Sequence, residues 1–176
     1  TNIETKFLNN AGGFFDYVKA CRLHQWVKNG LIFIPIASAH QLTETATLVS
    51  GLLAFLAFSL CASSVYLLND LLDLDSDRHH KTKRHRPFAK GTLSVLHGIL
   101  LIPALLISAG LLTTFLPPIF AAILVIYYCA TTSYSFCFKK TILLDVIILS
   151  GLYTTRIIAG AAATGIPLSE WLLVFS

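Results

Sequence analysis

The chain has 176 residues, of which 55% are hydrophobic and 12% are charged, and its formal net charge is +4. A soluble globular domain carries about 25% charged residues, so this composition excludes an ordinary soluble domain. Residues 45–69 and 91–138 contain no Asp, Glu, Lys or Arg. Uncharged stretches of ~20 apolar residues suit helices that cross a bilayer, and their lack of apolar–polar alternation excludes a membrane β-barrel. We therefore predict an all-α, polytopic transmembrane helical bundle.

The first expected elements lie near the N-terminus. Residues 1–13 are predicted to be a polar N-terminal segment, followed by one transmembrane domain over residues 14–176. Residues 14–27 mix apolar and charged side chains and predict an amphipathic segment at the membrane surface. A first span is expected over residues 26–39, where Pro35 should kink the helix. Its uncharged part is short for a span, so we expect tilt, a break or shelter by neighbouring helices.

Four more spans and the beginning of a sixth follow in the chain. The four are predicted over residues 46–68, 95–116, 119–138 and 143–163. The second is expected to continue as a helix beyond residue 68, and Pro117-Pro118 should end the third. Gly165-Ile166-Pro167 predicts a turn, after which Ser169 and Glu170 favour the start of a sixth helix. Because the sequence has no Met and ends inside an apolar stretch, we expect a piece of a longer protein.

The basic residues predict how the bundle is oriented. Twelve of the thirteen Lys and Arg residues lie before or at the start of the first span, or in the connections after the second and fourth spans. The connections on the other side contain no Lys or Arg. Since basic connections favour the cytoplasmic side, we predict that these three regions face the cytoplasm.

An acidic cluster follows the second span. Asp70, Asp73 and Asp77 have the spacing i, i+3, i+7, which places them on one stripe of a continuous helix with Asn69 beside it. Their mutual repulsion and the negative end of the helix dipole are both unfavourable. A divalent cation removes both costs, and Mg²⁺ binds one or two carboxylates together with substrate phosphates. We predict that the three aspartates bind Mg²⁺ and are catalytic, and that Asn69 binds substrate. The alternative is a solvated acidic helix end that pairs with the basic loop after it.

Two further groups of residues are candidates for substrate binding. In the basic loop over residues 79–91, Lys83 and Arg86 are expected to hold phosphate oxygens, although the loop could instead attract anionic lipid heads. In the fifth span, Tyr153 and Arg156 share a face. A charge within a span should point into the bundle and have a ligand or a partner, so Arg156 is either a substrate-binding or a structural residue.

These residues resemble a known family. Asn69-Asp70-x-x-Asp73-x-x-x-Asp77 is similar to the first aspartate-rich motif of the UbiA superfamily of intramembrane prenyltransferases, and Lys83-x-x-Arg86-Pro87-x-Ala89-x-Gly91 is similar to the loop after it. Residues 22–29, 145–163 (with Tyr-x-x-Arg-x-x-Ala-Gly at 153–160) and 166–171 resemble the bacterial decaprenyl-phosphate phosphoribosyltransferases within that superfamily. The resemblance covers about residues 20–176. It implies a bundle of about nine transmembrane helices around a cavity open to the cytoplasm, of which about six would lie in this chain. A second polar motif would lie after Ser176.

The resemblance also implies an activity in a bacterial inner membrane. The reaction would be Mg²⁺-dependent transfer of a phosphoribosyl group from phosphoribosyl diphosphate, a diphosphate-containing donor, to a polyprenyl phosphate. The aspartates would hold Mg²⁺ at the leaving diphosphate, Lys83 and Arg86 would hold phosphate oxygens, and Lys28 would meet the lipid phosphate. The alternative reaction is prenyl transfer from a polyprenyl diphosphate to an aromatic or other acceptor.

Two readings without catalysis stay open at this point. A cation-binding membrane transporter predicts acids near the membrane midplane and inverted repeats. A structural lipid anchor predicts that the aspartates are dispensable. We expect no nucleic-acid partner.

Overall fold

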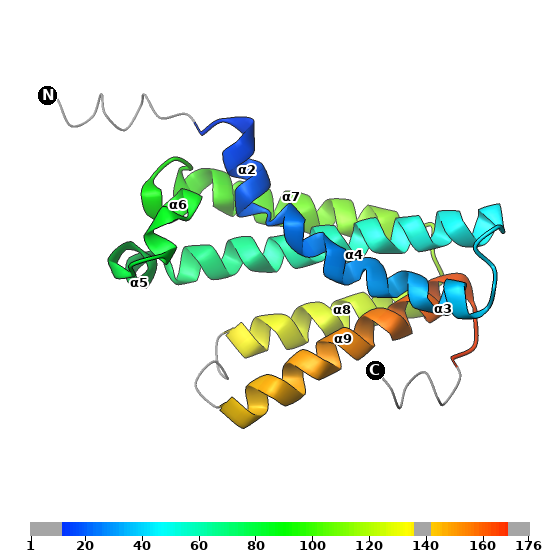
Figure 1. Cartoon of the computed structure of the whole chain (residues 1–176). Helices are drawn as coiled ribbons and strands as arrows, with labels where there is room; N and C mark the ends of the chain where they lie inside the picture. The colour runs from blue at the N-terminus through cyan, green and yellow to red at the C-terminus, as the bar shows by residue number, and fades with distance from the viewer. Residues whose placement is uncertain (1–11, 136–141, 169–176) are drawn as a thin grey trace, which may run out of the picture.

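The computed structural model describes residues 12–135 and 142–168. These residues form helices and no strands, which confirms the all-α prediction. Four helices lie side by side along the molecule (Figure 1): α4 (Thr45–Leu72), α7 (Val95–Thr113), α8 (Pro118–Ser133) and α9 (Ile142–Thr164). Helix α4 packs against each of the other three and is therefore the central element of the described bundle.

Two of these helices have the length and composition of membrane spans. In the part of the chain that the structure describes, α4 and α7 are long and apolar enough to cross a membrane, and α8 is a shorter apolar helix. Helix α7 exposes Leu96, Ile107 and Leu111, each by more than 60%. A helix that is apolar on all sides is either buried in protein or in contact with lipid, so the outward face of α7 suits a bilayer.

The N-terminal elements are more broken than the sequence predicts. The amphipathic segment forms an α-helix only over α2 (Phe14–Ala20). The expected first span is a 3₁₀ helix, η1 (Leu23–Phe33), followed by the short helix α3 (Ile34–Ser38). Pro35 lies in the first turn of α3, where its missing N–H costs no hydrogen bond. The chain changes from a 3₁₀ helix to an α-helix just before Pro35, where the sequence predicted a kink. This change agrees with the expectation that the short first span could be broken.

The prediction of one continuous helix through the acidic cluster is wrong. Helix α4 ends at Leu72, and α5 (Leu74–His79) begins after a break at Asp73, whose φ and ψ are −87° and 4°. Backbone hydrogen bonds from Asp73 N–H to the Asn69 carbonyl oxygen and from Asp77 N–H to the Asp73 carbonyl oxygen still connect the two helices across this break. The chain continues through η2 (Lys83–His85) and α6 (Pro87–Lys90) before α7. These short elements cover one end of the bundle (Figure 1).

The other helix boundaries follow the prediction more closely. Helix α7 begins at the predicted Val95 but ends at Thr113, three residues before the expected end. The Pro117-Pro118 pair separates α7 from α8, as predicted, and α9 matches the fifth span within one residue at each end. The last residues of the fourth span, the N-terminal residues 1–11 and the sixth helix with Ser169 and Glu170 lie outside the described residues.

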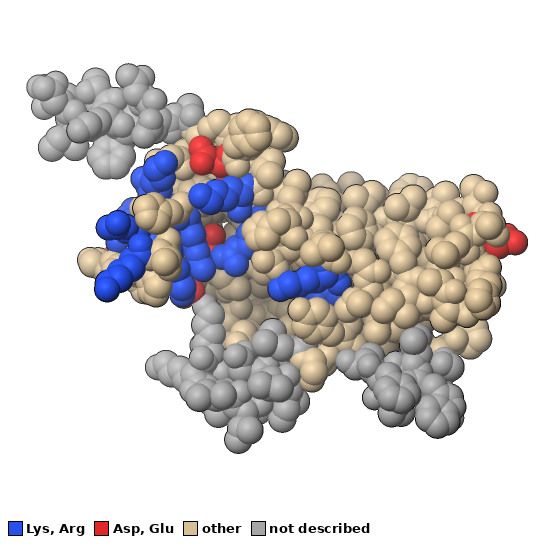
Figure 2. Space-filling model, viewed as in Figure 1, with Lys and Arg blue, Asp and Glu red and all other residues tan. Residues whose placement is uncertain are grey.

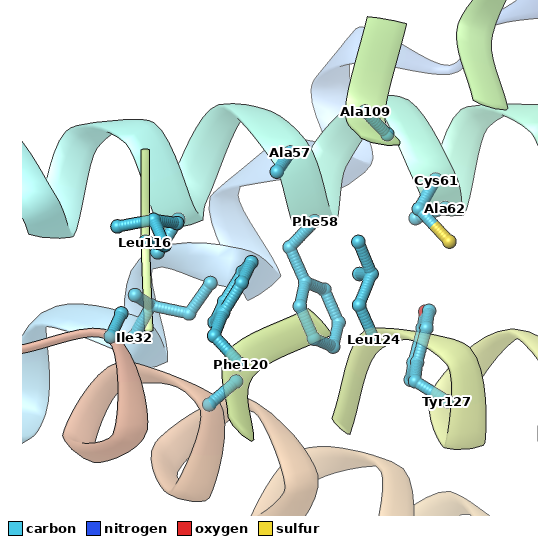
Figure 3. Close-up of a cluster of buried hydrophobic side chains, with 13 residues drawn as sticks. Ile32, Ala57, Phe58, Cys61, Ala62, Ala109, Leu116, Phe120, Leu124 and Tyr127 are labelled. Atoms are coloured by element: carbon cyan, nitrogen blue, oxygen red, sulfur yellow. The ribbon is translucent and has the colours of Figure 1, made fainter. Parts of the chain in front are cut away.

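The apolar core lies where α4, α8, α9 and η1 meet. Figure 3 shows Phe58 of α4 between Phe120 and Tyr127 of α8, with Ile32 of η1 nearby. Gly160 of α9 lies directly against η1, because a Cβ at this position would be 2.1 Å from the carbonyl oxygen of Ile32. Small residues permit such close helix contacts in membrane proteins. This contact brings the polar residues of η1 next to those of α9.

Candidate active site, an acidic–basic cluster beside a cavity

Two buried carboxylates face the same arginine across the helix break. Asp70 of α4 is 3% exposed and Asp77 of α5 is 1% exposed. One guanidinium nitrogen of Arg86, Nη1, lies 2.6 Å from Asp77 Oδ2 and 3.2 Å from Asp70 Oδ1. Arg22 Nη2 lies 2.6 Å from the same Asp70 oxygen. We call these four residues the acidic–basic cluster. In it, two cations offset the repulsion between two buried anions.

Arg22 is a member of this cluster that the sequence-based prediction missed. Its backbone is in the left-handed region, with φ and ψ of 50° and 48°. This conformation costs a non-glycine residue about 1–2 kcal/mol, and such strain concentrates at functional sites. Its guanidinium also lies 5.1 Å from the centre of the Tyr66 ring. The resemblance of residues 22–29 to a known family was the only signal in the sequence that could have indicated Arg22.

Asp73 lies at the break between α4 and α5. It is half-buried. Among the described residues, no three His, Cys, Asp or Glu side chains form a group that could hold a metal ion. The role of all three aspartates as metal ligands stays a prediction. Arg86 of the basic loop pairs with Asp70 and Asp77, as in the alternative, but both carboxylates are buried and not solvated.

Two buried oxygen atoms nevertheless suit a hard cation. Asn69 Oδ1 and Asp77 Oδ1 have no hydrogen-bond partner among the described residues. Buried polar atoms without a partner are rare, so each calls for an explanation. Amide and carboxylate oxygens are ligands for hard cations, and Mg²⁺ needs only one or two carboxylates when phosphates and waters complete its shell. The donor chemistry of Asn69 and Asp77 thus fits Mg²⁺.

A cavity of about 160 Å³, with a mainly apolar lining that carries a few polar groups, opens beside the cluster. Its lining includes two cations, Lys28 and Arg156, and no acidic residue among those that the structure describes. It also includes Tyr66, Asn69, Tyr127 and Tyr153. Tyr66 stacks with Arg22, and Asn69 directly precedes Asp70, so the cavity and the acidic–basic cluster adjoin each other.

Arg156 points into the bundle, as predicted, and is held there without an acid among the described residues. It is 5% exposed, and its Nε donates to Asn29 Oδ1 at 2.8 Å. Its other nitrogens donate to the Leu152 carbonyl oxygen and to the Tyr127 hydroxyl. The rings of Tyr127 and Tyr153 have their centres 5.3 and 5.4 Å from the guanidinium carbon. Neutral groups thus orient a cation at the cavity wall, where it can receive an anion.

The residues predicted to bind substrate lie in three places: in the cavity, in the acidic–basic cluster and on the surface. Lys28 and Tyr153 are exposed and line the cavity, together with Asn69 and Arg156. Arg86 belongs to the acidic–basic cluster, whereas Lys83 is exposed in η2, outside the cavity. Lys and Arg side chains gather at the end of the molecule that carries α5 and α6 (Figure 2).

Comparison with known proteins identifies the family. Residues 31–176 match the UbiA prenyltransferase family. The chain belongs to this family. A UbiA homolog from Archaeoglobus fulgidus, solved bound to DMAPP and Mg²⁺, has the same fold, with a TM-score of 0.75 over 90% of this chain and 58% of that chain. At 21% identity this likeness concerns the fold alone, and it confirms the predicted UbiA-type helical bundle.

Curated relatives of this UbiA chain are more similar in sequence. A decaprenyl-phosphate phosphoribosyltransferase of Mycobacterium tuberculosis is 39% identical over 167 residues, which cover 89% of this chain and 53% of the relative. The nodulation protein NoeC of Azorhizobium caulinodans is 40% identical over 163 residues, which cover 93% of this chain and 53% of the relative. The chain therefore spans about half the length of these relatives. The resemblance seen in the sequence is confirmed at the level of the family.

Proposed function

We propose that the full-length protein is a Mg²⁺-dependent transferase that moves a phosphoribosyl group from phosphoribosyl diphosphate to a polyprenyl phosphate. The observation that carries this proposal is the position of two buried carboxylates, Asp70 and Asp77, directly beside a cavity lined by cations. The relatives named decaprenyl-phosphate phosphoribosyltransferase, at 39% identity, favour this donor and acceptor.

The reaction requires a leaving group and an oxygen nucleophile. An oxygen of the lipid phosphate attacks C1 of the ribose, and the bond from C1 to the diphosphate breaks. The diphosphate leaves with the bonding electron pair. Mg²⁺, when bound, would neutralise the charge that develops on the leaving group. Asp70, Asp73 and Asp77 are the proposed carboxylate ligands, with the buried oxygen of Asn69 beside them.

In this proposal, Arg22 and Arg86 of the acidic–basic cluster also bind the phosphate groups of the donor. Arg22 and Arg86 fix the carboxylate oxygens that they contact, and each guanidinium has further donors for phosphate oxygens. Fixed donors stabilise developing charge because they need little reorganisation during the reaction. We therefore assign Arg22 and Arg86 to donor binding, together with Lys83 on the surface.

The cavity cations suit the acceptor. Lys28 and Arg156 face the same space, and no acid among the described lining residues neutralises them. A lipid phosphate bound there would have its tail between the helices and the bilayer. Tyr153, 37% exposed at the cavity wall, would pack against the head of the lipid. We propose that this site opens to the cytoplasm of a bacterium, because the basic side chains gather at its end of the bundle (Figure 2).

Prenyl transfer from a polyprenyl diphosphate is the second candidate reaction. It uses the same diphosphate leaving group, and the archaeal UbiA homolog with the same fold binds DMAPP and Mg²⁺. A cation transporter is a weaker candidate, because a transport site needs acids near the membrane midplane. The described acids Asp70 and Asp77 lie at one end of α4 and in the helix that follows it.

The test is an assay of the full-length protein in nanodiscs. Phosphoribosyl diphosphate with a polyprenyl phosphate is compared with a prenyl diphosphate and an aromatic acceptor, each with Mg²⁺ and with EDTA. We expect product from the first pair only. Asp70→Asn should lower kcat/KM by about 100-fold or more. The matched control is Glu44→Gln, an exposed acid before α4, which should behave as wild type. Consumption of neither donor would refute both reactions.

A further inference from the structure

A basic hollow lies on the surface next to the acidic–basic cluster. It has a volume of about 300 Å³ and is lined by Lys19, Thr82, Lys83, His85 and Arg86. Lys19 comes from α2, whereas the other four lie in the connection after α5. The ammonium group of Lys19 donates to the carbonyl oxygen of His85 at 3.4 Å, which joins the two segments. This hollow is separate from the cavity lined by Lys28 and Arg156, with which it shares no lining residue.

The charges of the hollow favour an anion. Three cationic side chains face it, and none of its described lining residues is acidic. Lys19 and Lys83 form no ion pair with Asp or Glu among the described residues, and Arg86 pairs only on the side of the acidic–basic cluster. A phosphate monoester carries about −1.5 to −2 charges at neutral pH and three acceptor oxygens. Such a group would offset the repulsion between the cations and accept their hydrogen bonds.

Arg86 connects the hollow to the proposed diphosphate site. Its side chain lines the hollow, while its Nη1 atom contacts Asp77 and Asp70. One small molecule with two phosphate groups could therefore reach both places. Phosphoribosyl diphosphate has this form, with a diphosphate on C1 and a phosphate monoester on C5. A prenyl diphosphate has an anionic group at one end only.

We propose that the basic hollow binds the 5-phosphate of the sugar donor, with Lys19 as a residue that determines donor specificity. This inference rests on the proposed phosphoribosyl transfer. The hollow would give this chain a means to prefer a sugar diphosphate with a second phosphate over a prenyl diphosphate. A lipid headgroup phosphate has the same chemistry and is the other source of an anion at this surface.

The test uses two competitors with the full-length protein. Ribose 5-phosphate carries only the phosphate monoester, and inorganic pyrophosphate carries only the diphosphate. Both are measured as inhibitors of phosphoribosyl transfer in neutral nanodiscs. Lys19→Gln should raise the inhibition constant of ribose 5-phosphate and the KM of phosphoribosyl diphosphate by about tenfold, because a charge-assisted hydrogen bond is lost. It should leave kcat and the inhibition constant of pyrophosphate unchanged, because the contact is remote from the breaking bond.

The controls separate a local effect from damage to the fold. Lys90→Gln removes an exposed cation nearby that does not line the hollow, and it should behave as wild type. Lys19→Arg should restore ribose 5-phosphate binding, and Lys83→Gln should act like Lys19→Gln. If Lys19→Gln matches Lys90→Gln, or weakens both competitors equally, the assignment is overturned.

The remaining outcomes distinguish the two proposals from each other. If Lys19→Gln changes only the response to phosphatidylglycerol in the nanodiscs, the hollow is a lipid site and the donor assignment is overturned. If the wild-type protein consumes no phosphoribosyl diphosphate, the proposed function itself fails, and the hollow assignment fails with it. If the wild-type protein is active and the Lys19 variants bind ribose 5-phosphate normally, only the hollow assignment fails.

Discussion

Removal of Arg86 should destabilise the protein through a specific neighbour, Asp77. The Asp77 carboxylate is 1% exposed, and Arg86 is its ion-pair partner at 2.6 Å. Asp70 has a second partner in Arg22, so it keeps one cation when Arg86 is lost. Arg86→Gln would therefore leave one buried carboxylate without its counter-charge. Breaking a buried ion pair by removal of one partner costs about 3–5 kcal/mol.

The expected loss of stability in Arg86→Gln is somewhat lower than the loss for a fully buried ion pair. Arg86 is 25% exposed, so water already weakens the attraction in the wild-type protein. We estimate a loss of about 2–3 kcal/mol. For a chain of this size, each kcal/mol lowers the melting temperature by about 2–4 °C, so the expected change is about 5–10 °C. Thermal unfolding of the purified protein in detergent, without substrate, measures it.

A double-mutant cycle tests whether the unpaired Asp77 carboxylate causes the loss of stability in Arg86→Gln. Asp77→Asn removes the charge that Arg86→Gln leaves behind, so the double variant should be more stable than Arg86→Gln alone. The coupling between the two sites should exceed about 1 kcal/mol. Arg84→Gln, an exposed arginine in η2, is the matched control and should change stability by less than about 0.5 kcal/mol. Additive effects of the two substitutions would refute the reasoning.

Three further predictions concern other parts of the molecule. Gly160→Ala should lower stability by about 1–3 kcal/mol in thermal unfolding, because its Cβ would lie 2.1 Å from a backbone oxygen of η1. Gly151→Ala in the same helix has open space and should be neutral or stabilising by up to about 1 kcal/mol. Asn29→Asp would place a carboxylate on Arg156, so the KM for the polyprenyl phosphate should rise about tenfold while the KM for the sugar donor stays constant. If Asp73 is a metal ligand, Asp73→Asn should raise the Mg²⁺ concentration needed for half-maximal activity by about tenfold or more, and an unchanged Mg²⁺ requirement would exclude that role.

The helices were predictable where local composition decides them. The uncharged stretches indicate the positions of α4 and α7, the apolar composition of residues 143–163 indicates α9, and Pro117-Pro118 marks the turn into α8. The position of Arg156 was also predictable, since a cation deep in an apolar helix has to point inward. These inferences need only the sequence of one segment and the cost of a polar group in an apolar environment.

The features that depend on contacts between distant segments were not predictable. Helical periodicity places Asp70, Asp73 and Asp77 on one stripe, but it does not show that the helix breaks at Asp73. Asp70 and Asp77 share Arg86, which comes from a later segment. Arg22 was missed because its partner Asp70 is 48 residues away. The sequence contains the charges of the site, whereas the pairing depends on how the segments pack.

Buried hydrogen bonds explain how the N-terminal segment places Arg22 so close to Asp70. The indole nitrogen of Trp26 donates to Ser63 Oγ at 3.0 Å, and Ser63 Oγ donates to the Cys21 carbonyl oxygen at 2.8 Å. Apolar contacts alone would allow η1 to slide along α4, because lipid-facing and protein-facing apolar surfaces are almost equivalent in a membrane. Directional bonds on both sides of Arg22 remove that freedom and support its left-handed backbone. Ser63 of α4 therefore belongs to the site as much as the charges do, since its hydrogen bonds fix the position from which Arg22 reaches Asp70.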